Sequence, residues 1–160
     1  MADLRGLLDD AGYSKVRTYV QSGNVVLSSH AEPAELEREA GGLISERFGF
    51  DVPVIVRTRD ELAAVVERDP LGAEVTEHKR YQVSFMSGEL QAEQVTVLKE
   101  LAGETERLVI IGREAYAWHP EGVARSKLWN KLAGKGLGVT ATARNWTTVT
   151  TLLAMADDGC

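Results

Sequence analysis

The sequence is poor in cysteine and in long apolar runs, and each shortage excludes a class of protein. The single cysteine, Cys160, is the last residue, so no intramolecular disulfide can form, which suits a reducing compartment. No apolar run reaches the roughly 20 residues that a membrane span needs. The opening, MADLRGLLDDAGY, carries acidic residues where a secretory signal needs an apolar core. These shortages predict a cytoplasmic protein with no membrane partner.

The common metal-binding and catalytic patterns are also missing from the sequence. The three histidines, His30, His78 and His119, lie far apart, with no His-x3-His or cysteine pair, so we expect no metal site. Neither the G-x-S-x-G turn nor the G-x-x-x-x-G-K-[ST] loop occurs. The glycines of residues 134–138 follow a predicted helix and precede a strand, the wrong context for a dinucleotide. The sequence predicts no cofactor and leaves open whether the protein is an enzyme.

The net charge is negative, and the charged residues are unevenly distributed along the chain. The net charge of −6 disfavours non-specific binding of nucleic acid by the protein as a whole. Residues 1–112 carry 12 basic and 20 acidic side chains, whereas residues 113–144 carry six basic and two acidic ones. All three tryptophans lie between residues 115 and 146. An anion is therefore expected to bind in this later segment.

The first part of the chain predicts helix, strand, strand, helix and strand. The opening leucines recur at helical spacing, and Gly12 is a suitable C-terminal cap. Strands are expected over 16–20 and 25–27, because Gln-Ser-Gly-Asn between them is typical of a turn. A helix is expected to start at Pro33, and a strand to cover 52–56.

The second part of the chain repeats this order after a connecting helix. Thr58 and Glu61 have the spacing of a capping box that opens the connecting helix, and residues 73–79 form a polar loop. The expected elements that follow are a strand over 81–86, a helix from 91 to 103, strands over 108–111 and 115–118, a helix over 123–133, a strand over 139–143 and a helix from 145.

This order predicts an α+β protein built from two ferredoxin-like βαββαβ units, the first without its first strand. Each sheet would be antiparallel, with its helices packed on one face. The expected division is a truncated first unit over 1–58, a connection over 59–79, and a second unit with a C-terminal helix over 80–160.

Four segments resemble one family of proteins of unknown function, DUF1697. They are the opening helix, VRTYVQSGNVV at 16–26, AWHPEGVARSKL at 117–128 and TARNWTTV at 142–149. The resemblance extends over essentially the whole chain and implies a duplicated ferredoxin-like fold, in agreement with the element order. It implies no activity, because none is known for the family.

The chain departs from the family pattern at its start. Members of the family carry a strand similar to ALLRGINVGG before the first helix, whereas this sequence begins inside that helix. Because the first strand of a ferredoxin-like sheet is central, its absence would expose backbone groups that can pair with another chain. We expect the gene to encode roughly 25 further residues upstream, the length of a loop and strand.

The candidate ligand-binding residues lie near two predicted helix starts and one turn. Free N–H groups at helix starts favour anions, and arginine binds phosphate or carboxylate through two hydrogen bonds. The resemblance adds the turn residues and the histidine. The candidates are Arg125, Ser126, Lys127, Arg144, Asn145, His119, Gln21, Ser22 and Asn24.

Structural roles for the same residues stay open. Asn145 suits a helix cap, the basic side chains suit a solvated surface, and the residues at 21–24 suit turn chemistry. The function expected from the residues is the binding of a small phosphate-containing ligand. The alternatives are an oligomerising module that pairs through sheet edges, and a small enzyme in which His119 exchanges a proton.

Overall fold

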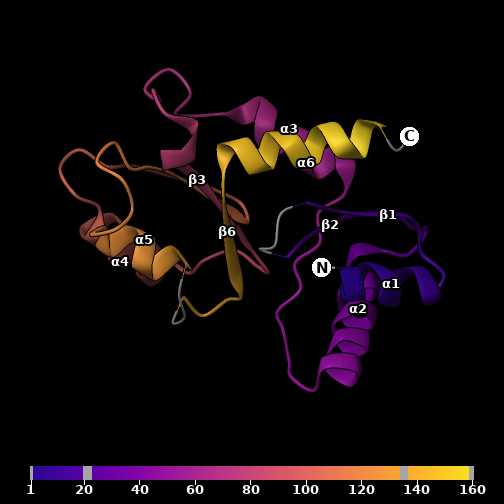
Figure 1. Ribbon diagram of the computed structural model, residues 1–160. Coiled ribbons are helices and arrows are strands. Elements are labelled where there is room, and N and C mark those ends of the chain that lie inside the picture. The colour runs from indigo at the N-terminus through magenta and orange to yellow at the C-terminus, as the bar shows by residue number, and fades with distance from the viewer. Residues whose placement is uncertain (1, 20–22, 134–136, 159–160) are drawn as a thin grey trace. The chain divides into compact units, whose positions relative to one another are not determined.

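The structure is a computed structural model that describes residues 2–19, 23–133 and 137–158 (Figure 1). It contains two compact units. Unit 1 comprises Met1–Ala63 and Thr151–Cys160, and unit 2 comprises Ala64–Thr150. The division into 1–58, 59–79 and 80–160 stays a prediction. None of the helices in the described ranges has both the length and the apolar character that crossing a membrane requires.

Unit 1 begins with two helices and a two-stranded antiparallel sheet. Its elements are α1 (Ala2–Asp10), β1 (Ser14–Tyr19), β2 (Asn24–Ser28) and α2 (Pro33–Phe48). The predicted hairpin and the predicted helix start at Pro33 are confirmed. Gly12 follows α1 with a φ of 99°, a left-handed conformation that glycine adopts without strain.

The predicted strand over 52–56 does not form. Residues 51–58 have no regular secondary structure, and the sheet of unit 1 pairs only β1 with β2 within the described residues. The amide of Val56 donates to the carboxylate of Glu37 at 2.8 Å, so a side chain takes the place of a neighbouring strand. Val54 still packs against the core of unit 1. The prediction of a strand here was wrong, because a strand needs a neighbouring strand as well as a suitable sequence.

The capping box that opens the connecting helix, α3 (Arg59–Arg68), is confirmed. The Glu61 carboxylate accepts from the Thr58 amide at 2.8 Å, and the Thr58 hydroxyl accepts from the Glu61 amide at 3.1 Å. Each bond satisfies an amide that a helix start leaves without an internal partner.

Unit 2 is organised around a four-stranded antiparallel sheet in the order β4-β5-β3-β6. A short 3-10 turn, His78–Arg80, precedes the sheet. The remaining elements are β3 (Tyr81–Met86), α4 (Ala92–Leu101), β4 (Arg107–Ile111), β5 (Glu114–Trp118), α5 (Lys127–Ala133), β6 (Ala141–Asn145) and α6 (Trp146–Asp158), whose residues from Thr151 belong to unit 1.

Both faces of the central strand β3 are covered, and all six of its residues are buried. On one face α4 and α5 contribute Leu98 and Leu128 to a core shared with Met86 (Figure 1). On the other face the Tyr81 and Trp146 rings stack with their centroids 4.7 Å apart. The structure therefore differs from the expectation of helices on one face only. Tyr81, Val83 and Phe85 lie on one side of β3 and Met86 on the other, and each side needs a cover.

Candidate functional site

One end of the unit 2 sheet brings together residues that are distant in the sequence. Trp118, the last residue of β5, pairs with Tyr81 at the start of β3 and with Arg107 at the start of β4. His119 follows directly, and its amide donates to the Arg80 carbonyl at 3.0 Å. The sheet thereby fixes Trp118 on both sides, and the bond to Arg80 fixes the backbone of His119.

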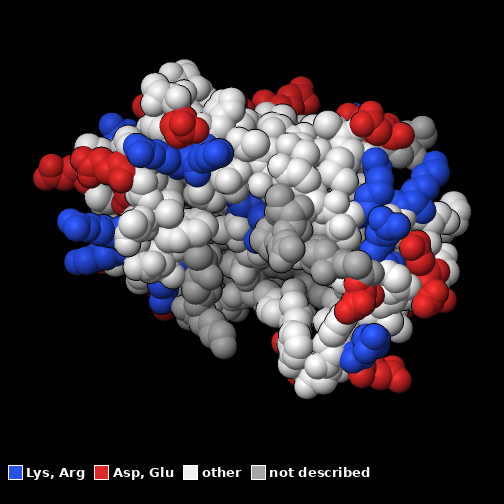
Figure 2. Space-filling model, in the orientation of Figure 1, with Lys and Arg blue, Asp and Glu red and all other residues white. Residues whose placement is uncertain are grey.

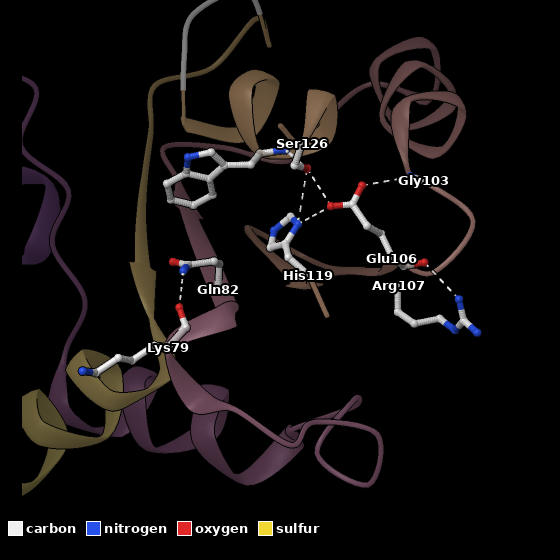
Figure 3. A network of polar contacts seen from close by, with 8 residues as sticks. Lys79, Gln82, Gly103, Glu106, Arg107, His119 and Ser126 are labelled. Atoms are coloured by element: carbon white, nitrogen blue, oxygen red, sulfur yellow. Dashed lines mark hydrogen bonds and ion pairs between the residues drawn. The ribbon is translucent and has the colours of Figure 1, made fainter. Parts of the chain in front are cut away.

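The His119 ring is completely buried and takes part in a carboxylate network (Figure 3). Its Nδ1 atom forms a hydrogen bond with Oε2 of Glu106. The Ser126 hydroxyl donates to the same oxygen at 2.6 Å. The second oxygen, Oε1, accepts from the Gly103 amide at 2.9 Å. The carboxylate of Glu106 thus receives three hydrogen bonds from three separate segments.

These hydrogen bonds determine the charge of Glu106 and the tautomer of His119. Burial by itself raises the pKa of Glu106, but the bonds from Ser126, Gly103 and His119 outweigh it and hold the pKa below its ordinary value. An ionised carboxylate can only accept, so Nδ1 of His119 must carry a hydrogen. In the neutral ring the lone pair then lies on Nε2.

The Nε2 atom of His119 is buried and has no hydrogen-bond partner among the described residues. The indole of Trp129 meets the ring edge-on, at 82° and 6.1 Å between centroids. In Figure 3 Gln82 lies on the side of the ring opposite Glu106, with its amide nitrogen donating to the Lys79 carbonyl at 2.9 Å. A buried polar atom without a partner is costly, so this nitrogen needs an explanation.

Ser126 has a structural role that excludes it as a nucleophile of the usual kind. Its oxygen accepts from the Trp129 amide at 3.0 Å, which makes Ser126 the N-cap of α5. The hydroxyl lies 3.4 Å from Nδ1 of His119, on the side of the ring away from Nε2. A serine nucleophile is activated by the ring nitrogen that does not contact the carboxylate.

The prediction that α5 starts at Val123 was wrong, because the helix begins at Lys127. A turn at Gly122, with a φ of 88°, and a bond from the Ser126 amide to the Val123 carbonyl keep this segment outside the helix. Arg125 and Lys127 are exposed on either side of the buried Ser126.

The second predicted helix start also has its cap in place. The side-chain oxygen of Asn145 accepts from the Thr148 amide at 2.9 Å, so Asn145 is the N-cap of α6. Burial lowers the pKa of Arg144, whose guanidinium donates to the Thr142 hydroxyl and to the Ala143 carbonyl, both at 2.8 Å. Roles for Arg144 and Asn145 in ligand binding stay predictions.

The turn candidates belong to unit 1. The amide nitrogen of Asn24 donates to the Tyr19 carbonyl at 3.1 Å and closes the hairpin, as turn chemistry predicts. Gln21 and Ser22 lie outside the described residues. The structure joins His119 and Ser126 through Glu106, and Arg144 and Asn145 belong to the same sheet.

Sequence reasoning missed Glu106, Gln82 and Trp129. A usable signal existed for Glu106, because the β4–β5 register, extended by one position beyond Arg107 and Trp118, sets residue 106 opposite His119. No comparable signal identifies the other two, whose places depend on how the sheet and α5 pack.

On the face drawn in Figure 2, basic and acidic residues are interspersed. Exposed pairs such as Arg107 with Glu74, 3.7 Å apart, illustrate this mixture. Within the described residues no group of three or more His, Cys, Asp or Glu side chains could hold a metal ion.

Comparisons with known proteins bear on the family and the fold. A family model described as "Protein of unknown function (DUF1697)" matches residues 1–116. The solved structure of a conserved bacterial protein from Streptococcus pneumoniae is similar, with a TM-score of 0.72 and 21% sequence identity. The match covers 98% of this chain and 88% of that one, and at this identity it shows the fold alone. No curated protein matches the chain.

Proposed function

The chain belongs to the DUF1697 family, whose function is unknown, and we propose that it binds the acidic group of a small phosphate- or carboxylate-containing ligand at Nε2 of His119. The observation that carries the proposal is the buried Nε2 atom without a partner. Buried polar groups in folded proteins nearly always have a hydrogen-bond partner, and a ligand oxygen is one that the described residues do not supply.

The Glu106 carboxylate makes Nε2 of His119 a suitable acceptor for the proton of an acidic ligand. When a ligand transfers a proton to Nε2, the ring becomes positive, and the adjacent negative carboxylate stabilises it. The resulting N–H donates to the ligand oxygen as a charge-assisted hydrogen bond. The exposed Arg125 and Lys127 flank Ser126 and favour an anion in the surrounding solvent.

The same arrangement supports a small enzyme as the second candidate. A histidine whose Nδ1 is held by a carboxylate has a fixed tautomer, and its Nε2 can accept a proton from a bound substrate. Ligand binding comes first in either case, so binding is the property to test first.

The finer fold assignment is part of this proposal. The order β4-β5-β3-β6 supports a ferredoxin-like unit, because the first strand of the βαββαβ sequence lies second from one edge. In unit 1 the order of α1, β1, β2 and α2 supports a similar unit whose first strand is absent. A cytoplasmic location is proposed on the single terminal cysteine.

The binding test is a titration of the 15N-labelled protein with inorganic phosphate and, separately, with acetate. We expect the Nε2 signal of His119 to move while its Nδ1 signal stays in place, because Glu106 holds Nδ1. The variant His119→Gln should lose the binding, and the matched control His78→Gln, changed at an exposed histidine, should keep it. An unmoved Nε2 signal with both anions, or unchanged binding by His119→Gln, rejects the proposal.

A further inference from the structure

Three polar side chains from neighbouring strands share one face at the end of the unit 2 sheet. Across the register of β3 and β6, Gln82 lies opposite Asn145. Gln82 also lies opposite Ala117 of β5, two residues before His119. Side chains two positions apart on a strand share a face, and the bond from the His119 amide to the Arg80 carbonyl continues the ladder. His119, Gln82 and Asn145 therefore point to the face that α5 covers.

The two carboxamide groups of this row have fixed orientations. The Gln82 nitrogen donates to the Lys79 carbonyl, which can only accept, so the Gln82 oxygen points away from Lys79. The Asn145 oxygen accepts from the Thr148 amide, so the Asn145 nitrogen points away from Thr148. Neither the Gln82 oxygen nor the Asn145 nitrogen has a hydrogen-bond partner in the parts of the chain that the structure describes. The row thus presents a hydrogen-bond acceptor next to a donor.

The row becomes more exposed from His119 toward Asn145. His119 and Gln82 are buried, whereas Asn145 and the neighbouring Trp129 are half-buried. Gln82 lies on the side of the His119 ring away from Glu106, and Glu106 binds the ring at Nδ1 (Figure 3). A ligand at Nε2 is therefore a small one, with one polar group at the imidazole and a second at the two amides.

We propose that this ligand is a small 2-hydroxycarboxylic acid. Its carboxyl group binds Nε2 of His119, and its hydroxyl group lies between Gln82 and Asn145. This assignment rests on the proposed function, the binding of an acidic group at Nε2.

The hydroxyl group is what the two amides have in common. A single hydroxyl oxygen donates to the Gln82 oxygen and accepts from the Asn145 nitrogen. The ammonium group of an amino acid can only donate, so it leaves the Asn145 nitrogen without a partner. An acid without a second polar group leaves both amides unsatisfied, which costs binding free energy.

The test compares glycolate with acetate, which differs from it by the hydroxyl alone. The 15N-labelled protein is titrated with each acid, and the Nε2 signal of His119 reports the Kd. Glycolate should bind about tenfold more tightly than acetate, because it adds two hydrogen bonds to the amides.

Two variants assign the preference to the amides. Gln82→Met and Asn145→Ser should each reduce the preference for glycolate by about threefold and leave the Kd of acetate unchanged. Serine keeps the cap of α6 while it removes the amide donor. Asn130→Ser, which changes an exposed asparagine, is the matched control and should keep the full preference.

The outcomes separate this assignment from the proposed function. If neither acid moves the Nε2 signal, the proposed function fails, and the hydroxy acid fails with it. If glycolate and acetate move the signal with equal Kd, an acid binds at His119 but the hydroxy-acid assignment is overturned. The wild-type ratio of the two Kd values decides this without any variant that has to fold. Variants that keep the full preference overturn the roles of Gln82 and Asn145.

Discussion

The two units share a similar order of elements but differ in how completely they bury their sheets. In unit 2 the central strand β3 has neighbours on both sides, and all six of its residues are buried. In unit 1 the sheet has two strands, and most residues of β1 and β2 remain partly exposed. The difference shows that a central strand determines whether the flanking apolar residues become a closed core.

The candidate site follows from this difference. His119 is held by backbone bonds at the end of a fully paired strand, so its ring can be oriented by Glu106 with little freedom. A binding site on a rigid scaffold keeps its geometry without a ligand.

The largest expected effect on stability comes from replacing a leucine by alanine in a helix of each unit. Leu98 of α4 is completely buried, whereas Leu43 of α2 is only partly buried. We expect Leu98→Ala to lower the free energy of unfolding by about 3 kcal/mol, and Leu43→Ala to lower it by about 1 kcal/mol, because the cavity term grows with burial. Urea denaturation followed by circular dichroism measures both, and equal losses would contradict the comparison.

The next effect concerns the acid sensitivity of unit 2. The folded state lowers the pKa of Glu106 from its ordinary value of 4.5. The ionised carboxylate therefore adds to the free energy of unfolding at every pH above that value. As the pH falls through the lowered pKa, the carboxylate is protonated and the contribution is lost. Glu106→Gln should remove this part of the pH dependence and cost about 1–3 kcal/mol at pH 7, because one carboxylate oxygen that accepted a bond is replaced by a donor.

Tryptophan fluorescence during urea denaturation at pH 7 and at a series of pH values below 4.5 measures the Glu106 effect, since Trp118, Trp129 and Trp146 all belong to unit 2. Glu104→Gln is the matched control, because Glu104 is exposed in the same loop. If the wild type and Glu106→Gln lose the same stability on acidification, Glu106 does not carry this pH dependence.

A smaller effect is expected at the two helix caps of unit 2. Ser126→Ala removes the cap of α5 and one hydrogen bond to Glu106, whereas Asn145→Ala removes only the cap of α6. We expect losses of about 2 kcal/mol and about 1 kcal/mol, respectively, since a cap contributes about 1 kcal/mol. Thermal unfolding of both variants measures the difference, and a larger loss for Asn145→Ala would show that the Glu106 network adds nothing.

Local patterns in the sequence were enough to predict the hairpin, the capping box and the α+β class. These features depend on residues that are close in the chain, such as Thr58 and Glu61 or Asn24 and its turn. The strand at 52–56 failed for the opposite reason, because its formation depends on a partner strand. The network of Glu106, His119 and Ser126 was predicted only in part. The sequence indicated His119 and Ser126, but their link through Glu106 depends on the β4–β5 register.

The smallest expected effect tests whether unit 1 can be strengthened without a new strand. Gly42 lies in the middle of α2, and an added methyl group there would meet no atom within 4 Å. Gly42→Ala should therefore raise the stability of α2 by roughly 0.5–1 kcal/mol, because alanine loses less backbone entropy than glycine in a helix. Amide hydrogen exchange of α2 measures this gain, with exchange in β3 as the internal control. Slower exchange in α2 alone would show that the weakness of unit 1 is local to its own elements, whereas equal slowing in β3 would show that the two units unfold together.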